Sequence, residues 1–215
     1  AMARAKDLDP DSARVRATID LMKSKGVPLD TTAMTLERLM LSRQGEVQEG
    51  DAPYLDHVPI GYQRYRKRSF VPLTKPQDDA AYRDAFGKLI ETMRTLDASG
   101  IQLLPGTDDT TGFSLHRELE LYVKAGLSPG KALRRATLDC ERYFGRDHLL
   151  GSIERGKLAD FILVDGDPTR DISRIRQVRM TMRGGVVYFP SEIYTYLSVR
   201  PFAAPPPVTS TGSGE

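Results

Sequence analysis

The stretch IQLLPGTDD, residues 101–109, joins a short apolar run to a proline, a glycine and two acids. An apolar run of this length that ends in Pro and Gly is typical of a buried strand that stops abruptly. The residues that follow, 110–126, have the spacing of a helix. Asp108 and Asp109 therefore lie where a strand gives way to a helix. In α/β folds, ligands and catalytic groups collect at this position.

Helical and strand-like segments alternate on both sides of this stretch. Such alternation favours parallel strands connected by helical crossovers. We expect residues 101–104 to pair in parallel with 27–31, with the helix of 79–99 as a right-handed crossover between them. The helices that we expect in this part span residues 11–26, 34–41, 78–99, 110–126 and 128–143.

Residues 42–77 show little periodicity and carry several Gly, Pro and charged residues. Long loops of this kind are usually functional or disordered. The segment includes YQRYRKR, residues 62–68, in which basic and aromatic side chains interleave. This pattern suits either nucleic-acid binding or a solvated loop. Because the net charge of the chain is only +2, we favour the solvated loop and expect no nucleic-acid partner.

The pattern changes after Gly145. One apolar strand is expected at 160–164, and two alternating strands, 178–183 and 186–189, are expected to form a hairpin over Gly184-Gly185. These strands should form a sheet of their own, apart from the parallel pair. The Pro- and Ser-rich C-terminal residues indicate an extended or disordered tail. The divisions that we expect are residues 1–148, 149–190 and the tail, 191–215.

Composition is that of an ordinary soluble protein, with 40% hydrophobic and 28% charged residues. The small net charge does not imply attraction to nucleic acid or membranes, and the apolar run at 161–164 is far too short to cross a bilayer. The single cysteine, Cys140, excludes an internal disulfide, and its place on the apolar side of a helix favours a core role over a nucleophile. Because Ala1 precedes Met2, we interpret the chain as part of a longer sequence, and its compartment stays open.

Several motifs in the second half of the chain together resemble a known family. They are PGTDD (105–109), LHRELELYVKAGLSPGKAL (115–133), RATL (135–138), LGSIERGKLADFILVDGDP (150–168) and V-x-M-T-M-x-G-G-V-V-Y (178–188). Their order and spacing resemble the C-terminal part of the amidohydrolase superfamily, and within it the imidazolonepropionase-like branch.

The resemblance implies a fold. Members of this family have a (β/α)₈ TIM-like barrel and a small β-sandwich that is built from segments before and after the barrel. The chain would then be α/β, with strands seven and eight of the barrel and their helices in residues 1–148. Residues 149–190 would be part of the sandwich domain. Asp108 would lie at the C-terminal end of the eighth strand, where barrel enzymes place catalytic groups.

The resemblance also implies a chemistry. The family hydrolyses C–N bonds with water that is activated by a divalent metal, usually zinc. Asp108 would coordinate the metal, take the proton from the attacking water and pass it to the departing nitrogen. Without the resemblance, a helix N-cap would be favoured for Asp108, and we keep that role for Asp109. His116, in LHRELE, is expected either to contact the substrate or to be a solvated helix histidine.

The chain departs from the family in its metal ligands. The family uses a His-x-His pair on the first strand and further ligands on the fourth, fifth and sixth strands. The histidines here are His57, His116 and His148, and no two are separated by one residue. One carboxylate does not hold a catalytic zinc, and two strand–helix units do not close an eight-stranded barrel. We therefore expect the C-terminal portion of a longer metal-dependent amidohydrolase that is inactive without its N-terminal remainder.

The other polar candidates are expected to be structural. We interpret His57 and His148 as surface residues, and Lys157 and Asp160 as turn residues of the sandwich segment. The alternative to an enzyme is a stand-alone binding or interaction module derived from half of an amidohydrolase, although its unpaired strand edges would favour aggregation. The expected substrate is a small amide-type molecule, with no membrane partner. The oligomeric state is left open.

Overall fold

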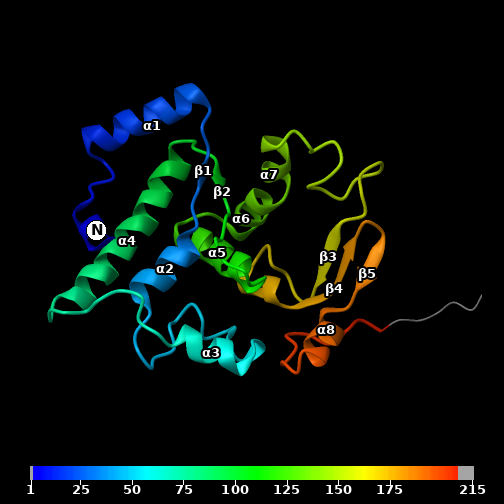
Figure 1. Ribbon diagram of the computed structural model, residues 1–215. Coiled ribbons are helices and arrows are strands. Elements are labelled where there is room, and N and C mark those ends of the chain that lie inside the picture. Colours follow the sequence, from blue (N-terminus) through cyan, green and yellow to red (C-terminus); the bar gives the residue numbers. More distant parts are fainter. Residues whose placement is uncertain (1, 208–215) are drawn as a thin grey trace, which may run out of the picture.

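Two small sheets organise the chain in the computed structural model, which describes residues 2–207 (Figure 1). The first sheet pairs β1 (Leu29–Asp30) with β2 (Leu103–Leu104) in parallel, so that Leu29 lies opposite Leu103. The long helix α4 (Asp78–Ala98) precedes β2 along the chain. The parallel pairing predicted from the sequence is confirmed, although each strand has only two residues.

Helices surround the parallel pair. The start of α1 (Ala13–Lys25) is capped by Ser12, whose side chain accepts a hydrogen bond from the backbone N–H of Val15, and its end by Gly26 in the left-handed conformation. The helix expected at 128–143 is divided at Thr137, whose φ of −124° and ψ of −98° are not helical. Its hydroxyl donates to Leu133 O, a contact that bends helices. The remaining helices of this part are η1 (Met2–Asp7), α2 (Ala33–Leu41), α5 (Phe113–Lys124), α6 (Pro129–Ala136) and α7 (Leu138–Tyr143).

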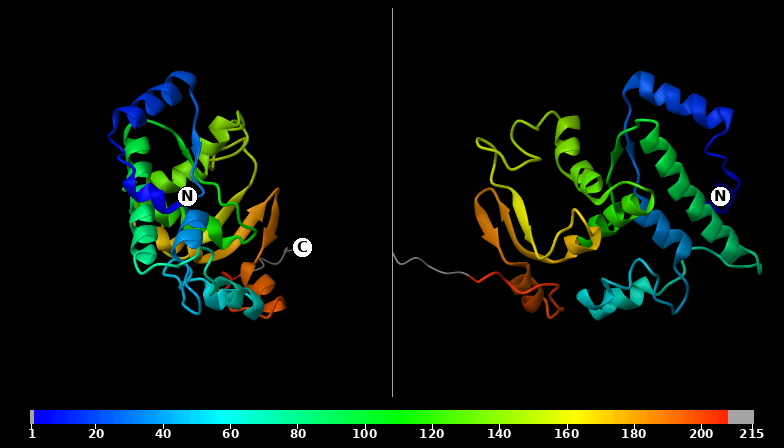
Figure 2. Two further views of the ribbon diagram at one scale, coloured as in Figure 1. Left: turned by 60° about the vertical axis from the view of Figure 1, so that its left-hand side comes forward. Right: turned by 180° about the vertical axis from the view of Figure 1, so that it is seen from behind.

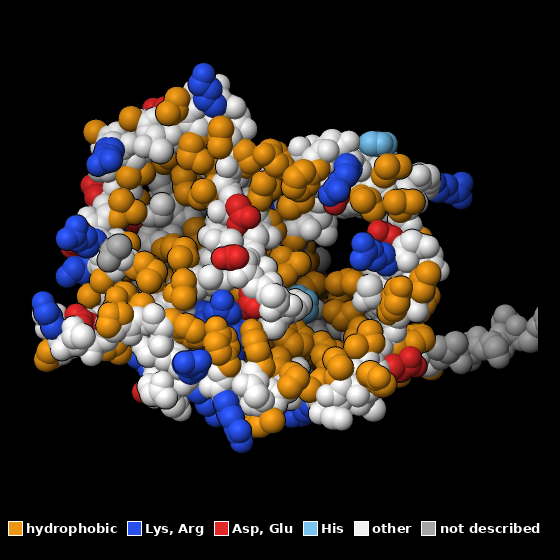
Figure 3. Space-filling model, in the orientation of Figure 1, with side chains coloured by type: hydrophobic (Ala, Val, Ile, Leu, Met, Phe, Trp, Pro, Cys, Tyr) orange, Lys and Arg blue, Asp and Glu red, His pale blue; other side chains and the backbone are white. Residues whose placement is uncertain are grey.

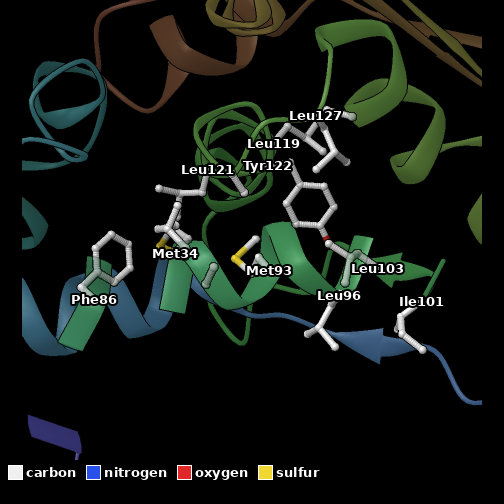
Figure 4. Close-up of a cluster of buried hydrophobic side chains, with 14 of the residues drawn as sticks. Met34, Phe86, Met93, Leu96, Ile101, Leu103, Leu119, Leu121, Tyr122 and Leu127 are labelled. Atoms are coloured by element: carbon white, nitrogen blue, oxygen red, sulfur yellow. The ribbon is translucent and has the colours of Figure 1, made fainter. Parts of the chain in front are cut away.

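The hydrophobic core lies where α2, α4 and α5 meet the parallel strands (Figure 4). Leu103 of β2 and Leu121 and Tyr122 of α5 are fully buried. Met34 of α2 and Met93 of α4 are 3% exposed. Most of the buried apolar surface of the chain therefore holds together the elements that carry the ends of β1 and β2.

Residues 42–77 are ordered, so of the two alternatives for this segment, functional or disordered, the disordered one is wrong, and residues 62–68, expected as a solvated loop, lie mostly in a helix. They contain the short helices η2 (Leu55–His57) and α3 (Ile60–Arg66). Tyr54, Leu55 and Val58 are buried against the rest of the protein, and Arg66 is only 7% exposed. The segment is ordered because its buried charges find partners on α2 and on the β2–α5 connection.

The second sheet is antiparallel, with strand order β3 (Phe161–Val164), β4 (Val178–Arg183) and β5 (Val186–Tyr188). Gly184 and Gly185 have φ of 56° and 81°, the conformation that a two-residue hairpin turn requires. Asp160 Oδ1 accepts a hydrogen bond from Gly184 N at 2.6 Å, so its turn role is confirmed. The short helix η3 (Ile172–Arg176) precedes β4. The expected three-stranded sheet is confirmed.

The second sheet and the N-terminal helices lie at opposite ends of the molecule (Figure 2). An open cleft separates β3 and β4 from the α6–α7 region, and Figure 3 shows this hollow with hydrophobic side chains around it. Ile153, beside the cleft, is 84% exposed, and Ile162 and Leu163 are 43% exposed. Apolar surface is therefore left uncovered on this sheet.

The C-terminal segment begins with a helix, α8 (Pro190–Tyr196), where the sequence predicted an extended or disordered tail from residue 191. Proline in the first turn favours a helix because its fixed φ is already helical. Phe202 then packs its ring on His57, at 3.4 Å between centroids. Residues 208–215 lie outside the described residues. Within residues 2–207, no helix has the length and apolarity needed to span a membrane.

Candidate functional site

Asp108 follows the carboxyl end of β2 and has a strained backbone. Its φ of 44° lies in the left-handed region, which non-glycine residues rarely adopt. Strain of this kind costs on the order of 1–3 kcal/mol and persists only where surrounding contacts enforce it. The Asp108 side chain is exposed, while the N-cap of α5 is Gly112 and that cap has no side-chain hydrogen bond. The alternative in which Asp108 caps α5 is therefore wrong.

The residues before Asp108 are tied to α2 and β1. Thr35 Oγ1, on α2, donates a hydrogen bond to Thr107 O at 2.6 Å. Gly106 packs directly on Asp30, the last residue of β1, and a Cβ at position 106 would lie 2.1 Å from either Asp30 carboxylate oxygen. Only glycine permits this approach, since real Cβ atoms do not come within 3.0 Å of a neighbour. The chain before Asp108 is thus held against both neighbouring elements.

The residue after Asp108 is held by two arginines. The Asp109 side chain is 4% exposed, and its Oδ2 accepts from Arg38 Nη1 and, at 3.1 Å, from Arg66 Nη2. Tyr62 OH donates to Oδ1 at 3.4 Å. Burial by itself raises the pKa of Asp109, but the two guanidinium groups outweigh it and hold the pKa below its usual value.

The helix-cap role expected for Asp109 is corrected by these contacts. Asp109 Oδ1 does accept a hydrogen bond from Thr111 N at 3.2 Å, but this bond closes a local turn before α5 begins. The dominant partners of the carboxylate are arginines from distant segments because a buried charge requires opposite charge. Asp109 therefore connects α2, α3 and the β2–α5 turn.

Asp30 was not among the residues singled out from the sequence. It ends β1, and the carboxyl ends of parallel strands meet at one edge of a sheet. Its exposed carboxylate lies against Gly106, in the same turn as Asp108. The sequence does contain an indication of this site, because Asp30 is an acid directly after a short apolar run. The same pattern indicated Asp108.

The side chain of His116, on α5, is largely buried. Burial lowers the pKa of His116 to about 4, against the effect of Glu120, which raises it, and Arg176 lowers it further. Its Nδ1 is buried and has no hydrogen-bond partner within residues 2–207. The charged groups around it belong to α5 and η3 and not to the Asp108 turn. His116 is therefore a neutral, largely buried side chain at ordinary pH, and the solvated alternative is wrong.

The family model described as the amidohydrolase family matches residues 9–188. The chain belongs to the amidohydrolase family. In sequence it is similar to an imidazolonepropionase from Geobacillus kaustophilus (strain HTA426), 33% identical over 81 residues, which are 35% of this chain and 19% of the relative. It is also similar to adenine deaminase 1 from Desulfotalea psychrophila (strain LSv54 / DSM 12343), 44% identical over 65 residues, 27% of this chain and 11% of the relative.

A solved structure shares the fold of this chain. The structure of a Xaa-Pro dipeptidase with bound methionine matches with a TM-score of 0.56 and 24% identity over 80% of this chain. The match covers 36% of that dipeptidase, so the amidohydrolase chain spans about a third of its length. The family and this neighbour together indicate an α/β fold of TIM-barrel type.

Amidohydrolases are generally metal-dependent, and a metal site needs several ligand side chains close together. Within residues 2–207, no three His, Cys, Asp or Glu side chains gather in a group that could hold a metal ion. Asp108 is a suitable oxygen ligand, but a catalytic zinc typically takes three protein ligands. The residues of this amidohydrolase that the structure describes therefore do not by themselves fit a metal centre.

The other polar candidates have structural contacts. His57 is half-buried and not a free surface residue, because its Nδ1 lies 2.6 Å from Arg200 O and its ring stacks on Phe202. His148 is exposed, as expected. Cys140 is half-buried, and burial raises the pKa of its thiol, the opposite of what a reactive thiolate needs.

A small cavity lies between α2, α3 and α5. It is lined by charged and aromatic side chains that include Glu37, Asp51, Arg66 and Arg117. Its volume of about 20 Å³ is close to the space of a single water molecule. A substrate cannot enter a space of this size, so this cavity is not a substrate site.

Proposed function

We propose that this chain contributes to an enzyme that hydrolyses C–N bonds in small amide-type molecules. The amidohydrolase family supports hydrolysis of such bonds, as do the names of its relatives, imidazolonepropionase and adenine deaminase. The observation that carries the proposal is Asp108, an exposed carboxylate in a strained conformation between two residues that are held in place. Strained backbone of this kind clusters at active sites.

Asp108 acts as the proton-transferring carboxylate in this proposal. It accepts a proton from the water molecule whose oxygen attacks the carbon of the C–N bond. It then donates that proton to the nitrogen as the bond breaks, so the carboxylate is regenerated at the end of the turnover. A divalent metal such as zinc, if bound beside Asp108, would lower the pKa of water and so make hydroxide available near neutral pH. From this chain we propose Asp108 as one ligand of that metal, with the other ligands provided by residues outside it.

We further propose that residues 1–148 provide strands seven and eight of the barrel, and residues 149–190 a segment of the sandwich domain. The parallel pair β1–β2, the separate antiparallel sheet and the partial coverage of the solved relative support this division. A barrel of eight strands would then need strands from outside the chain, and the chain alone would be inactive. Residues 42–77 belong to the barrel part as an ordered insertion.

His116 is proposed as a second-rank substrate contact. A neutral imidazole can donate or accept a hydrogen bond without adding charge to the site. Its position on α5, the helix that follows the Asp108 turn, supports this role, whereas its burial beside Glu120 and Arg176 indicates a smaller effect than that of Asp108.

The test is turnover by the protein that contains this chain, with its bound metal measured in parallel. Imidazolone propionate, adenine and Xaa-Pro dipeptides form the first substrate panel, since they represent the relatives named above. Asp108→Asn should lower kcat/KM by roughly 10²–10⁴-fold with little effect on folding, because the carboxylate is exposed. The matched control is Asp20→Asn, because Asp20 is also an exposed aspartate but lies on α1.

The competing interpretation is a non-catalytic binding module. It predicts saturable binding of a panel compound with no product, and no difference in product between wild type and Asp108→Asn. Near-normal turnover by Asp108→Asn with metal in place would contradict the catalytic role of Asp108.

A further inference from the structure

Segment 42–77 contacts the Asp108 turn through Tyr62, which donates to Asp109 Oδ1 at 3.4 Å, and through the buried Arg66. Arg66, at the end of α3, is 7% exposed, and its Nη2 donates to Asp109 Oδ2 at 3.1 Å. Its Nη1 lies 3.5 Å from Asp51 Oδ1, and its guanidinium carbon lies 5.0 Å from the centre of the Tyr62 ring. A guanidinium can hold a carboxylate, a second acid and an aromatic face at once, which an ammonium cannot.

Helix α2 supports the same turn from the other side. Arg38 is the second donor to Asp109 Oδ2, and Thr35 donates to Thr107 O. The residues on either side of Asp108 are therefore held by α2 and α3 together, while Asp108 itself keeps an exposed side chain. The left-handed backbone of Asp108 lies between these two fixed points.

We propose that Arg66, together with Arg38, is a positioning residue for Asp108. The arginines fix Asp109, and fixed Asp109 keeps Asp108 in its left-handed conformation. In this arrangement the long insertion, residues 42–77, acts on the proposed site through Arg66 alone among its arginines. The inference rests on the proposed function of Asp108. Its physical basis is that a misplacement of about 1 Å in a catalytic group can lower the rate roughly a hundredfold.

The experiment compares Arg66→Gln, Arg66→Lys and Asp109→Asn with the control Arg43→Gln in the protein that contains this chain. Arg43 is also 7% exposed and lies in the same segment, but it pairs with Asp79 at 2.6 Å and not with the Asp108 turn. We expect kcat to fall about tenfold to a hundredfold in Arg66→Gln and in Asp109→Asn, with KM changed less than about threefold. Arg66→Lys should recover part of this loss, since a lysine can still pair with Asp109.

Three further readouts separate positioning from stability. The double variant Arg66→Gln/Asp109→Asn should be no slower than the slower single variant, because both changes remove the same Arg66–Asp109 contact. Arg43→Gln should lower the melting temperature while leaving kcat unchanged. NMR backbone couplings and shifts of Asp108, which report φ without any substrate, should move away from the wild-type values in Arg66→Gln and in Asp109→Asn but not in Arg43→Gln.

Specific results would overturn the inference. If Arg66→Gln lowers stability as Arg43→Gln does but keeps both kcat and the NMR signature of Asp108, the arginine is purely structural. If Arg66→Gln moves the Asp108 signature but Asp108→Asn turns over normally, Arg66 holds the turn but the proposed function of Asp108 fails. The two failures are therefore distinguishable.

Discussion

Glu118 of α5 caps the start of α2: its Oε2 accepts a hydrogen bond from Met34 N at 2.7 Å. Its Oε1 accepts from Ala33 N at 3.1 Å and from the Thr31 hydroxyl. The residue at the N-cap position of α2, Thr32, has a φ of 40° and makes no side-chain cap. A fully buried carboxylate from another helix therefore satisfies the amide groups that the local sequence leaves open. This contact joins the two helices on either side of the Asp108 turn.

Glu118→Gln should destabilise the protein by about 1–3 kcal/mol. The amide keeps the size of the side chain but loses the charge-assisted hydrogen bonds and turns an NH₂ group towards backbone donors. Urea denaturation of the variant beside wild type measures the loss. Glu192→Gln, an exposed residue of α8, is the control and should change stability by less than about 0.5 kcal/mol. An unchanged free energy of unfolding in Glu118→Gln would show that the contact adds nothing to the stability of the fold.

The stability of the protein should fall between pH 6.5 and pH 4 because of His116. Its folded pKa of about 4 lies below the ordinary 6.5, so the unfolded chain binds the proton that the folded protein does not. The stability from this group is complete above pH 6.5 and decreases as the pH falls towards 4. The full loss is roughly 3 kcal/mol by the size of the pKa shift.

The measurement is the free energy of unfolding against pH for wild type and His116→Phe. The difference between the two curves isolates His116 from His57, whose pKa is also lowered by burial. Parallel curves from pH 7 to pH 4 would mean that His116 is solvated in the folded protein.

Gly106→Ala should disrupt the Asp108 turn. The new Cβ would lie 2.1 Å from the Asp30 carboxylate oxygens, so Asp30 or the turn must move. We expect a loss of about 1–3 kcal/mol. Gly87→Ala is the matched control, since Gly87 lies within α4 with nothing near its Cβ position, and alanine there should stabilise by about 0.4–1 kcal/mol. Equal effects of the two substitutions on the melting temperature would contradict the close approach of Gly106 to Asp30.

Phe202→Ala should release the C-terminal segment from residues 42–77. Phe202 lies on His57, and its ring centre lies 5.2 Å from that of Phe113 and 6.1 Å from that of Tyr54. Aromatic pairs of this geometry contribute about 0.5–1.5 kcal/mol each beyond the area that they bury. We expect faster proteolytic cleavage of the segment after residue 196. The protection of the α3 backbone amides against hydrogen exchange should stay unchanged. The control Phe144→Ala removes an exposed ring and should leave the proteolysis rate as it is. Identical digestion of wild type and Phe202→Ala would show that the ring does not anchor the segment.

Local patterns were sufficient for much of the fold. The parallel pairing of β1 and β2 follows from alternating helices and apolar runs, and the β4–β5 hairpin follows from Gly184-Gly185. The cap at Ser12 and the left-handed Gly26 are likewise local. These features could be predicted because hydrophobic periodicity and turn chemistry act over a few residues. The family motifs also indicate Asp108 without any information on its backbone conformation.

The surroundings of Asp108 could not be predicted in the same way. Asp109 pairs with Arg38, 71 residues away, and with Arg66, 43 residues away, and nothing in the local sequence of these residues marks them as partners. The same holds for Glu118, which caps a helix 84 residues earlier. A carboxylate and an arginine have the same sequence signature whether they are solvated or buried together. Which of the two occurs is decided by the desolvation and pairing of charges when the segments pack, and those depend on the tertiary structure alone.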